Sequence, residues 1–407
     1  MSIQESCEQF FRDRETGLIF SFLDARTLLP ATEELFCDAD LGFSDKVKGF
    51  SAAECCMHEN FGMCTGAYMM SEILHYRRTG EQRALTNVSR SLEGLRYAYK
   101  LGDKFEHGFF PKVYGRRFSE ETSTDQVLYA CYAMDAYYPL ASSTERSWIE
   151  EMIPSMIDFW CRRDYRYHYF TICDGTWQWP PQRFPALLSL AEKYSGCGKF
   201  AKEFERMVEF SKTPEHCQLA DAIKMNTPTD FEKVNGGWLT FAGADRVTME
   251  TMNYSILLKN KPAHPFSDIW KDGIRRIWDE VKVTLTQDGR YLSMTITDFK
   301  NGECRRTPGY ALDGTSYHGA KSSWSTMVVR AGLMALEFFP EWSSEVIPLA
   351  ENVLSKLDFN DCTYYDEPER FAPGERFKTK LLSGDAVTNW LWADELLQIA
   401  KGGRAVG

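Results

Sequence analysis

The chain has 407 residues, of which 43% are hydrophobic and 14% aromatic, so it can bury a large core. Its formal net charge is -11 with no basic block or Lys/Arg stripe, which argues against nucleic acid or an anionic membrane surface as a partner. Acidic residues near the N-terminus and the lack of an apolar run of about 18 residues predict neither a signal peptide nor a membrane span. The 12 cysteines are scattered and lack metal-ligand spacing, so we expect a cytoplasmic protein without a metal or cofactor.

Amphipathic segments separated by Gly, Pro and Asp loops follow one another along the chain and pair through short turns. We predict helices at 18–29, 52–78, 81–101, 124–140, 144–164, 181–194, 199–211, 244–260, 266–286, 323–338, 342–357 and 386–401. One short strand is predicted at 290–297. The pattern favours an all-α fold in which six helical hairpins close into an (α/α)6 barrel as a single domain, 1–407, with its long loops on one face. A helical solenoid is the alternative architecture.

The loop before the predicted helix at 124–140 is rich in Gly, Pro, aromatic and basic residues. Ser123 or Thr124 can cap that helix, which places Asp125 in its first turn, where the helix dipole favours a carboxylate. Capping alone would explain Asp125. The other interpretation places Asp125 at the mouth of a pocket, with substrate-binding neighbours Tyr114, Arg116 and Gln126.

Two stretches resemble a known family. Glu59-Asn60-Phe61-Gly62, followed by Tyr76-Arg77-Arg78-Thr79-Gly80-Glu81, resembles a hairpin of the six-hairpin glycosidase superfamily, whose members are (α/α)6 barrels. Ser123-Thr124-Asp125-Gln126 is similar to the start of the next inner helix, which in unsaturated glucuronyl hydrolases carries the catalytic Asp. The resemblance implies Asp125 as general acid and base, and it aligns Glu59-Asn60 with an Asp of those enzymes.

Cleavage of a glycosidic bond needs two carboxyl groups that face one pocket. Asp125 is the first candidate, and Glu59 is the second, with Asn60 beside it as a substrate-binding residue. Glu59 can equally be the partner of an Arg within the barrel wall. Hydration of the vinyl ether in an unsaturated uronide needs only one carboxyl group, first as acid and then as base, so Asp125 can suffice there.

Other loops carry residue types that suit sugars. Aromatic rings offer flat faces for pyranose stacking, and an Arg can bind a substrate carboxylate in a forked geometry. The alternatives are an aromatic plug that seals the barrel and an Arg that caps a helix. The predicted substrate-binding residues in these loops are His168, Trp177, Trp179, Arg183, Trp238, Asp313, Tyr317 and His318.

We therefore predict a carbohydrate-active enzyme, a glycoside hydrolase that acts on uronic-acid-containing oligosaccharides with Asp125 as general acid and base. Three alternatives stay open. A lyase would use Tyr317 or His318 to abstract a proton, a magnesium-dependent terpene cyclase would start from Asp38-Ala39-Asp40, and a non-catalytic barrel would only bind sugar. The sequence leaves the oligomeric state open.

Overall fold

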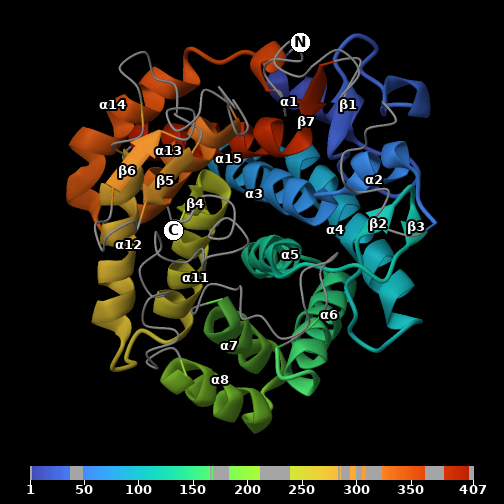
Figure 1. Ribbon diagram of the computed structural model, residues 1–407. Coiled ribbons are helices and arrows are strands. Elements are labelled where there is room, and N and C mark those ends of the chain that lie inside the picture. Colours follow the sequence, from blue (N-terminus) through green and yellow to red (C-terminus); the bar gives the residue numbers. More distant parts are fainter. Residues whose placement is uncertain are drawn as a thin grey trace. The chain divides into compact units, whose positions relative to one another are not determined.

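The computed structural model describes residues 2–36, 49–165, 167, 183–210, 239–282, 285, 294–298, 305–308, 323–362 and 380–402 (Figure 1). The chain divides into two compact units. Unit 1 comprises Met1–Thr176 and Asp358–Glu395, and unit 2 comprises Trp177–Leu357 and Leu396–Gly407. Helices dominate the described residues of both units, which confirms the all-α prediction.

Unit 1 contains the helices α1 (Ile3–Ser6), α2 (Ala52–His58), α3 (Phe61–Thr79), α4 (Gln82–Asp103), α5 (Thr124–Tyr137), α6 (Ser143–Arg162) and the larger part of α15 (Gly384–Lys401). The helix predicted at 52–78 is interrupted between α2 and α3. Asn60 leaves the helical conformation there, and its N–H donates to the Ser21 hydroxyl at 2.7 Å. Asn60 is thus the N-cap residue of a separate helix, α3.

The helix predicted at 18–29 is wrong. Phe22–Asp24 forms the strand β1, which pairs antiparallel with β7 (Leu381–Ser383). Asp24 then ends the strand in a turn, because its carboxylate accepts the backbone N–H of Arg26 at 3.0 Å. The apolar residues before this turn are buried on both faces, so their sequence lacks the alternation that identifies a strand.

Glycines on one face of α3 allow close approach to α5. A Cβ at Gly62 would lie 2.8 Å from Cβ of Gln126, and a Cβ at Gly66 would lie 2.6 Å from the carbonyl oxygen of Tyr129. The contact residue on α5 thus moves toward the C-terminus as the glycine on α3 does, from Gly62 with Gln126 to Gly66 with Tyr129. The two helices run parallel, and their N-terminal ends lie side by side.

The substitution Gly66→Ala tests this packing. We expect it to lower the free energy of unfolding by about 1–3 kcal/mol, because the added methyl group meets backbone rather than a movable side chain. Gly198→Ala is the matched control, since no atom lies within 4 Å of a Cβ there. Urea unfolding of both variants gives the comparison, and equal effects would contradict the close approach of α3 and α5.

Helix α15 lies along α3 in the same direction. The Cys64 thiol donates to Asp385 Oδ1 at 3.3 Å near the start of both helices, and His75 Nδ1 lies 2.8 Å from Glu395 Oε1 further along. Together with the α3–α5 packing, these contacts bring the N-terminal ends of α3, α5 and α15 to the same end of unit 1.

The far end of this helix group should respond to pH. Glu81 Oε2 lies 3.3 Å from His75 Nε2. Burial lowers the pKa of His75, but the carboxylates of Glu395 and Glu81 outweigh burial and raise it. A raised pKa makes protonated His75 stabilising below its ordinary value of about 6.5, and this contribution is lost as pH rises through the raised value. Replacing His75 by Gln should therefore cost about 1 kcal/mol or less near pH ~6 and nothing near pH ~9, as read from urea unfolding. A cost that does not change with pH would contradict this assignment.

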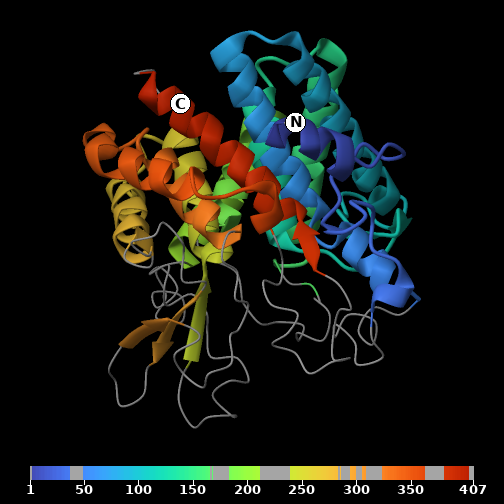
Figure 2. The ribbon, with the colours of Figure 1, turned by 90° about the horizontal axis from the view of Figure 1, so that it is seen from above.

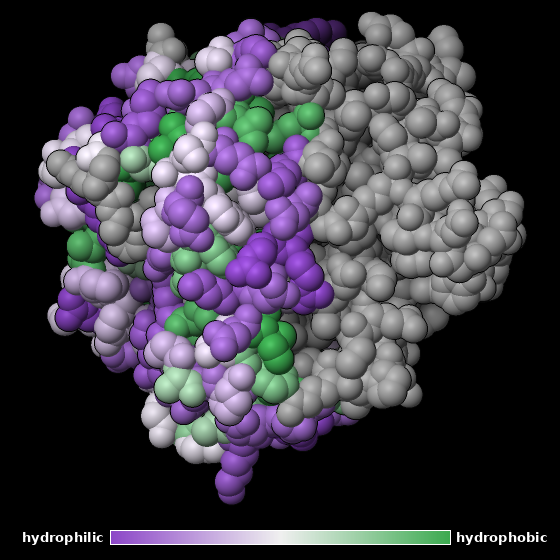
Figure 3. Space-filling model, turned by 90° about the vertical axis from the view of Figure 1, so that its left-hand side faces the viewer, coloured by the Kyte–Doolittle hydropathy of each residue, from purple (hydrophilic) through white to green (hydrophobic). Residues whose placement is uncertain are grey.

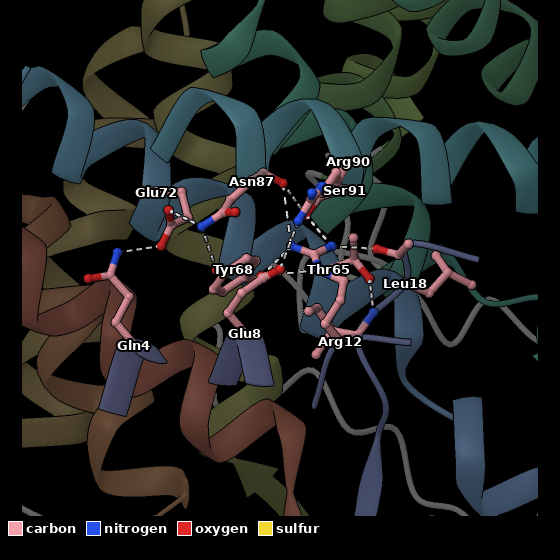
Figure 4. Close-up of polar contacts among 12 residues, drawn as sticks. Gln4, Glu8, Arg12, Leu18, Thr65, Tyr68, Glu72, Asn87, Arg90 and Ser91 are labelled. Carbon is pink, nitrogen blue, oxygen red and sulfur yellow. Dashed lines mark hydrogen bonds and ion pairs between the residues drawn. The ribbon is translucent and has the colours of Figure 1, made fainter. Parts of the chain in front are cut away.

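Polar contacts fasten the N-terminal segment to α3 and α4 (Figure 4). Glu8 Oε2 accepts from the hydroxyl of Tyr68 and from Nη2 of Arg12, both at 3.0 Å. Gln4 Nε2 donates to Oε1 of the buried Glu72 at 2.5 Å. These contacts hold the N-terminal segment in place as far as Arg12. The residues directly after Arg12 take part in the candidate site.

Unit 2 contains α7 (Arg183–Ser195), α8 (Gly198–Phe210), α11 (Ala244–Asn260), α12 (Ser267–Lys282), α13 (Ser323–Ala335) and α14 (Ser343–Leu354). Helix α11 packs against α7, α12 and α13. The strand β4 (Leu239–Gly243) leads directly into α11 and pairs with β5 (Met294–Asp298), which pairs with β6 (Arg305–Pro308) (Figure 2). The strand predicted at 290–297 is thus confirmed in part as β5, whereas β4 and β6 were missed.

Helix α12 is amphipathic, as predicted. It buries Trp270, Ile274 and Trp278 on one side and exposes charged residues such as Asp272 and Arg275 on the other. Figure 3 shows one face of the molecule, on which polar side chains cover most of the described surface and apolar ones occur in small groups. Among the described residues, no helix is long and apolar enough to cross a bilayer.

Candidate active site

The loop between α4 and α5 forms a short hairpin. The strands β2 (Val113–Tyr114) and β3 (Arg117–Phe118) pair through a two-residue turn, in which Gly115 and Arg116 have φ values of 53° and 63°. Such a left-handed turn matches the twist of two antiparallel strands. The hairpin fixes the directions of the side chains that come from this loop.

Lys112 and Tyr114 converge on Glu59. The Lys112 ammonium group forms an ion pair with Glu59 Oε1, and the Tyr114 hydroxyl donates to Oε2 at 3.0 Å. All three side chains are buried. Burial raises the pKa of Glu59, and the negative charge of Asp125 acts in the same direction, while Lys112 and Tyr114 oppose both. Glu59, Lys112 and Tyr114 thus form a buried cluster next to Asp125, which we call the buried brace. The cation that pairs with Glu59 is Lys112, whereas the sequence interpretation named an Arg.

Gln126 joins the start of α5 to the start of α3. Its Nε2 donates to the backbone carbonyl of Glu59 at 2.6 Å, and its Oε1 accepts the N–H of Gly62 at 3.1 Å. The side chain is buried, and these contacts engage both ends of its amide. Gln126 thus fixes the start of α5, where its neighbour Asp125 lies, and its predicted contact with substrate stays a prediction.

Asp125 lies in the first turn of α5, as predicted, and its side chain is half-buried. Ser123 is the N-cap residue, but its hydroxyl bonds to Asp125 Oδ1 instead of capping the helix. The N–H of Gln126 also donates to Oδ1, at 3.0 Å. Within the part of the chain that the structure describes, Oδ2 has no hydrogen-bond partner. One oxygen thus orients the carboxyl group, and the other can bind a substrate or water.

Arg116 belongs to a second ion cluster, separate from the ion pair of Glu59 and Lys112. Its Nε and Nη2 donate to the two carboxylate oxygens of Asp13 at 2.8 and 3.1 Å, and His58 Nε2 lies 3.4 Å from Asp13 Oδ2. Burial raises the pKa of Asp13, but His58 and Arg116 outweigh burial and hold it well below its usual range. Burial also lowers the pKa of His58, which favours a neutral imidazole. This cluster ties the hairpin to the N-terminal segment.

The remaining predicted site residues fall into two groups. Asn60 is half-buried at the start of α3, where its side chain does not cap the helix, and Arg183 is the buried first residue of α7 in unit 2. The residues outside the described ranges are His168, Trp177, Trp179, Trp238, Asp313, Tyr317 and His318, together with Asp38 and Asp40.

Sequence reasoning missed the roles of Asp13, His58 and Lys112, because their partners lie far away in the sequence. It also missed Asp385, a half-buried carboxylate in the first turn of α15 that accepts from Cys64. A signal for Asp385 was present, since Ser383-Gly384-Asp385 directly precedes the helix predicted at 386–401. Asp125 and Asp385 thus occupy the first turns of parallel helices, where the dipoles favour negative charge.

A scan against models of protein families and a search of curated proteins find no match. Solved structures do match. The Lin0763 protein from Listeria innocua has a TM-score of 0.52 at 12% identity, covering 99% of this chain and 96% of its own. A glycosyl hydrolase family 88 protein from Bacteroides vulgatus has a TM-score of 0.51 at 12% identity, covering 83% and 91%. The cellobiose 2-epimerase from Bacillus thermoamylovorans B4167 has a TM-score of 0.51 at 10% identity, covering 98% of each chain.

At these identities the likeness concerns the fold. The chain has an (α/α)6-barrel fold, as predicted. The helical solenoid is thereby set aside.

Proposed function

We propose that this protein is a glycoside hydrolase that acts on uronic-acid-containing oligosaccharides, with Asp125 as its general acid and base. The observation that carries the proposal is the contrast between two neighbouring carboxyl groups. Asp125 is oriented through one oxygen and half-buried, while Glu59 is buried and engaged by Lys112 and Tyr114. A fold shared with a glycosyl hydrolase and a sugar epimerase supports a sugar substrate.

The contrast between Asp125 and Glu59 favours hydration of an unsaturated uronide over ordinary cleavage of a glycosidic bond. Ordinary cleavage of a glycosidic bond uses two carboxyl groups on either side of that bond. Releasing Glu59 for this work would break its buried ion pair with Lys112 and its hydrogen bond with Tyr114, which is costly. Hydration of an unsaturated uronide needs one carboxyl group, so the site suits a sugar with a carbon–carbon double bond next to its ring oxygen.

In this reaction, Asp125 in its acid form gives a proton to the carbon of the double bond that is not bonded to the ring oxygen. The positive charge then develops on the carbon next to the ring oxygen, which shares it. The Asp125 carboxylate next takes a proton from a water molecule whose oxygen adds to that carbon, and the product is a hemiketal that opens spontaneously. Asp125 returns to its acid form, so the proton balance closes over one turnover.

Ultraviolet absorbance of a uronide oligosaccharide tests the proposal, because the double bond conjugated to the carboxylate is the chromophore. With an unsaturated disaccharide, we expect the absorbance to fall as the double bond is hydrated. A rise with a saturated polyuronide would indicate a lyase. A change of sugar configuration, seen by NMR without a change in absorbance, would indicate an epimerase, and either of these outcomes would overturn the proposed function.

A further inference from the structure

Unit 2 contains a buried polar centre that the proposed function does not use. Glu250 and Asn253 lie one turn apart on α11 and are 1% and 0% exposed. Asn253 Nδ2 donates to Glu250 Oε1 at 2.6 Å. We call Glu250, Asn253 and Arg183, which faces them from α7, the α11 polar centre.

Arg183 is the cation of this centre. It is 2% exposed, its Nη2 lies 3.3 Å from Sδ of Met249, and its charge acts on Glu250. Among the described charged groups on the helices packed against α11, Arg330 of α13 is also fully buried. Burial raises the pKa of Glu250 to about 7, while Arg183 and Asn253 act in the opposite direction. Glu250 is therefore placed to change its protonation near neutral pH.

Two oxygen atoms of the centre are buried and lack a hydrogen-bond partner among the residues that the structure describes. They are Glu250 Oε2 and Asn253 Oδ1. A buried acceptor without a donor costs about 1–3 kcal/mol, and more for a charged group, so such a pair of acceptors is uncommon without a ligand or water. Because positions three apart share one face of a helix, the two acceptors are neighbours.

We propose that the α11 polar centre binds two adjacent hydroxyl groups of a neutral sugar ring, which donate to Glu250 Oε2 and Asn253 Oδ1. Two acceptors side by side match a vicinal diol, whose two hydroxyl groups can both donate, whereas a carboxylate has no donor for them. The proposal rests on the proposed function only for the class of ligand, a sugar. It adds a contact for a neutral sugar ring within unit 2.

Binding also couples to protonation. Hydroxyl donors favour the ionised form of Glu250 and so lower its pKa on binding. With a free-state pKa of about 7, binding near pH 7 should release up to about half a proton per ligand. A side chain with a merely structural role would not produce this release.

Calorimetric titration tests the proposal with methyl β-D-glucopyranoside and its 2-, 3- and 4-deoxy analogues, in two buffers of different ionisation enthalpy. For the wild-type protein, we expect at least one deoxy analogue to bind about ten- to a hundredfold more weakly than its parent, with proton release. In Glu250→Gln, the preference for the parent sugar and the proton release should both disappear. Thr251→Val, which removes a buried hydroxyl elsewhere on α11, is the matched control and should keep both.

Absence of binding by all four probes, or a preference that survives Glu250→Gln, would overturn the proposal and leave a buried water as the occupant. The wild-type comparison of parent and deoxy sugars decides the question even if the variant fails to fold. Loss of the uronide reaction alone would sink the proposed function, while these neutral probes would still test the α11 polar centre.

Discussion

Replacing Asp125 by Asn is expected to lower the turnover of an unsaturated uronide by a factor of about 10²–10⁴, the usual contribution of a general acid and base. The amide cannot give a proton to the double bond or take one from water. It can keep the contacts of Oδ1 with Ser123 and the N–H of Gln126, so the fold should stay intact. Initial rates measured through the loss of absorbance give the comparison.

The matched control is Asp135→Asn, the same chemical change further along α5. It should leave turnover within about twofold of the wild type, because Asp135 lies near the other end of α5 from Asp125. Circular dichroism and thermal unfolding of both variants separate a loss of chemistry from a loss of fold. A variant at Asp125 that keeps wild-type turnover would sink the assignment.

Replacing Lys112 by Met is expected to lower the free energy of unfolding by about 3–5 kcal/mol, because the Glu59 carboxylate then stays buried without a counter-ion. Met keeps most of the length of the Lys side chain, so the missing charge is the main change. Adding Glu59→Gln in the same chain should recover much of the loss, since the amide needs no counter-ion. Urea unfolding of the single and double variants measures both effects.

Lys100→Met is the control for this change. Lys100 pairs with Glu151 at 2.5 Å, but the two side chains are 39% and 42% exposed, and a solvated pair contributes about 1 kcal/mol or less. If the change at Lys112 costs no more than the change at Lys100, the buried brace does not have the role given to it here.

Local patterns in the sequence were enough to identify most of the helices. The apolar period and the glycine after Thr79 predicted α3 and its end, where Gly80 is left-handed with φ of 77°. The stretch that forms β1 was mistaken for a helix, because residues buried on both faces carry no period. The prediction that the whole chain is one domain stays a prediction.

The candidate site could be predicted only where its residues are close in sequence. Asp125 was found from a helix start, which is a local signal. Arg116 and Asp13 are 103 positions apart, and Lys112 and Glu59 are 53 apart, so no spacing rule could pair them. For the same reason, the sequence could not predict the partners that Arg116 and Gln126 have within the protein, and their contacts with substrate stay predictions.

The most direct test of the central claim is a crystal structure of the Asp125→Asn variant with an unsaturated uronide disaccharide bound. The proposed function predicts that the substituted side chain lies within about 3.5 Å of the double-bond carbon that is not bonded to the ring oxygen. This is the distance needed for proton transfer. A disaccharide bound with its double bond away from the first turn of α5 would contradict the role of Asp125.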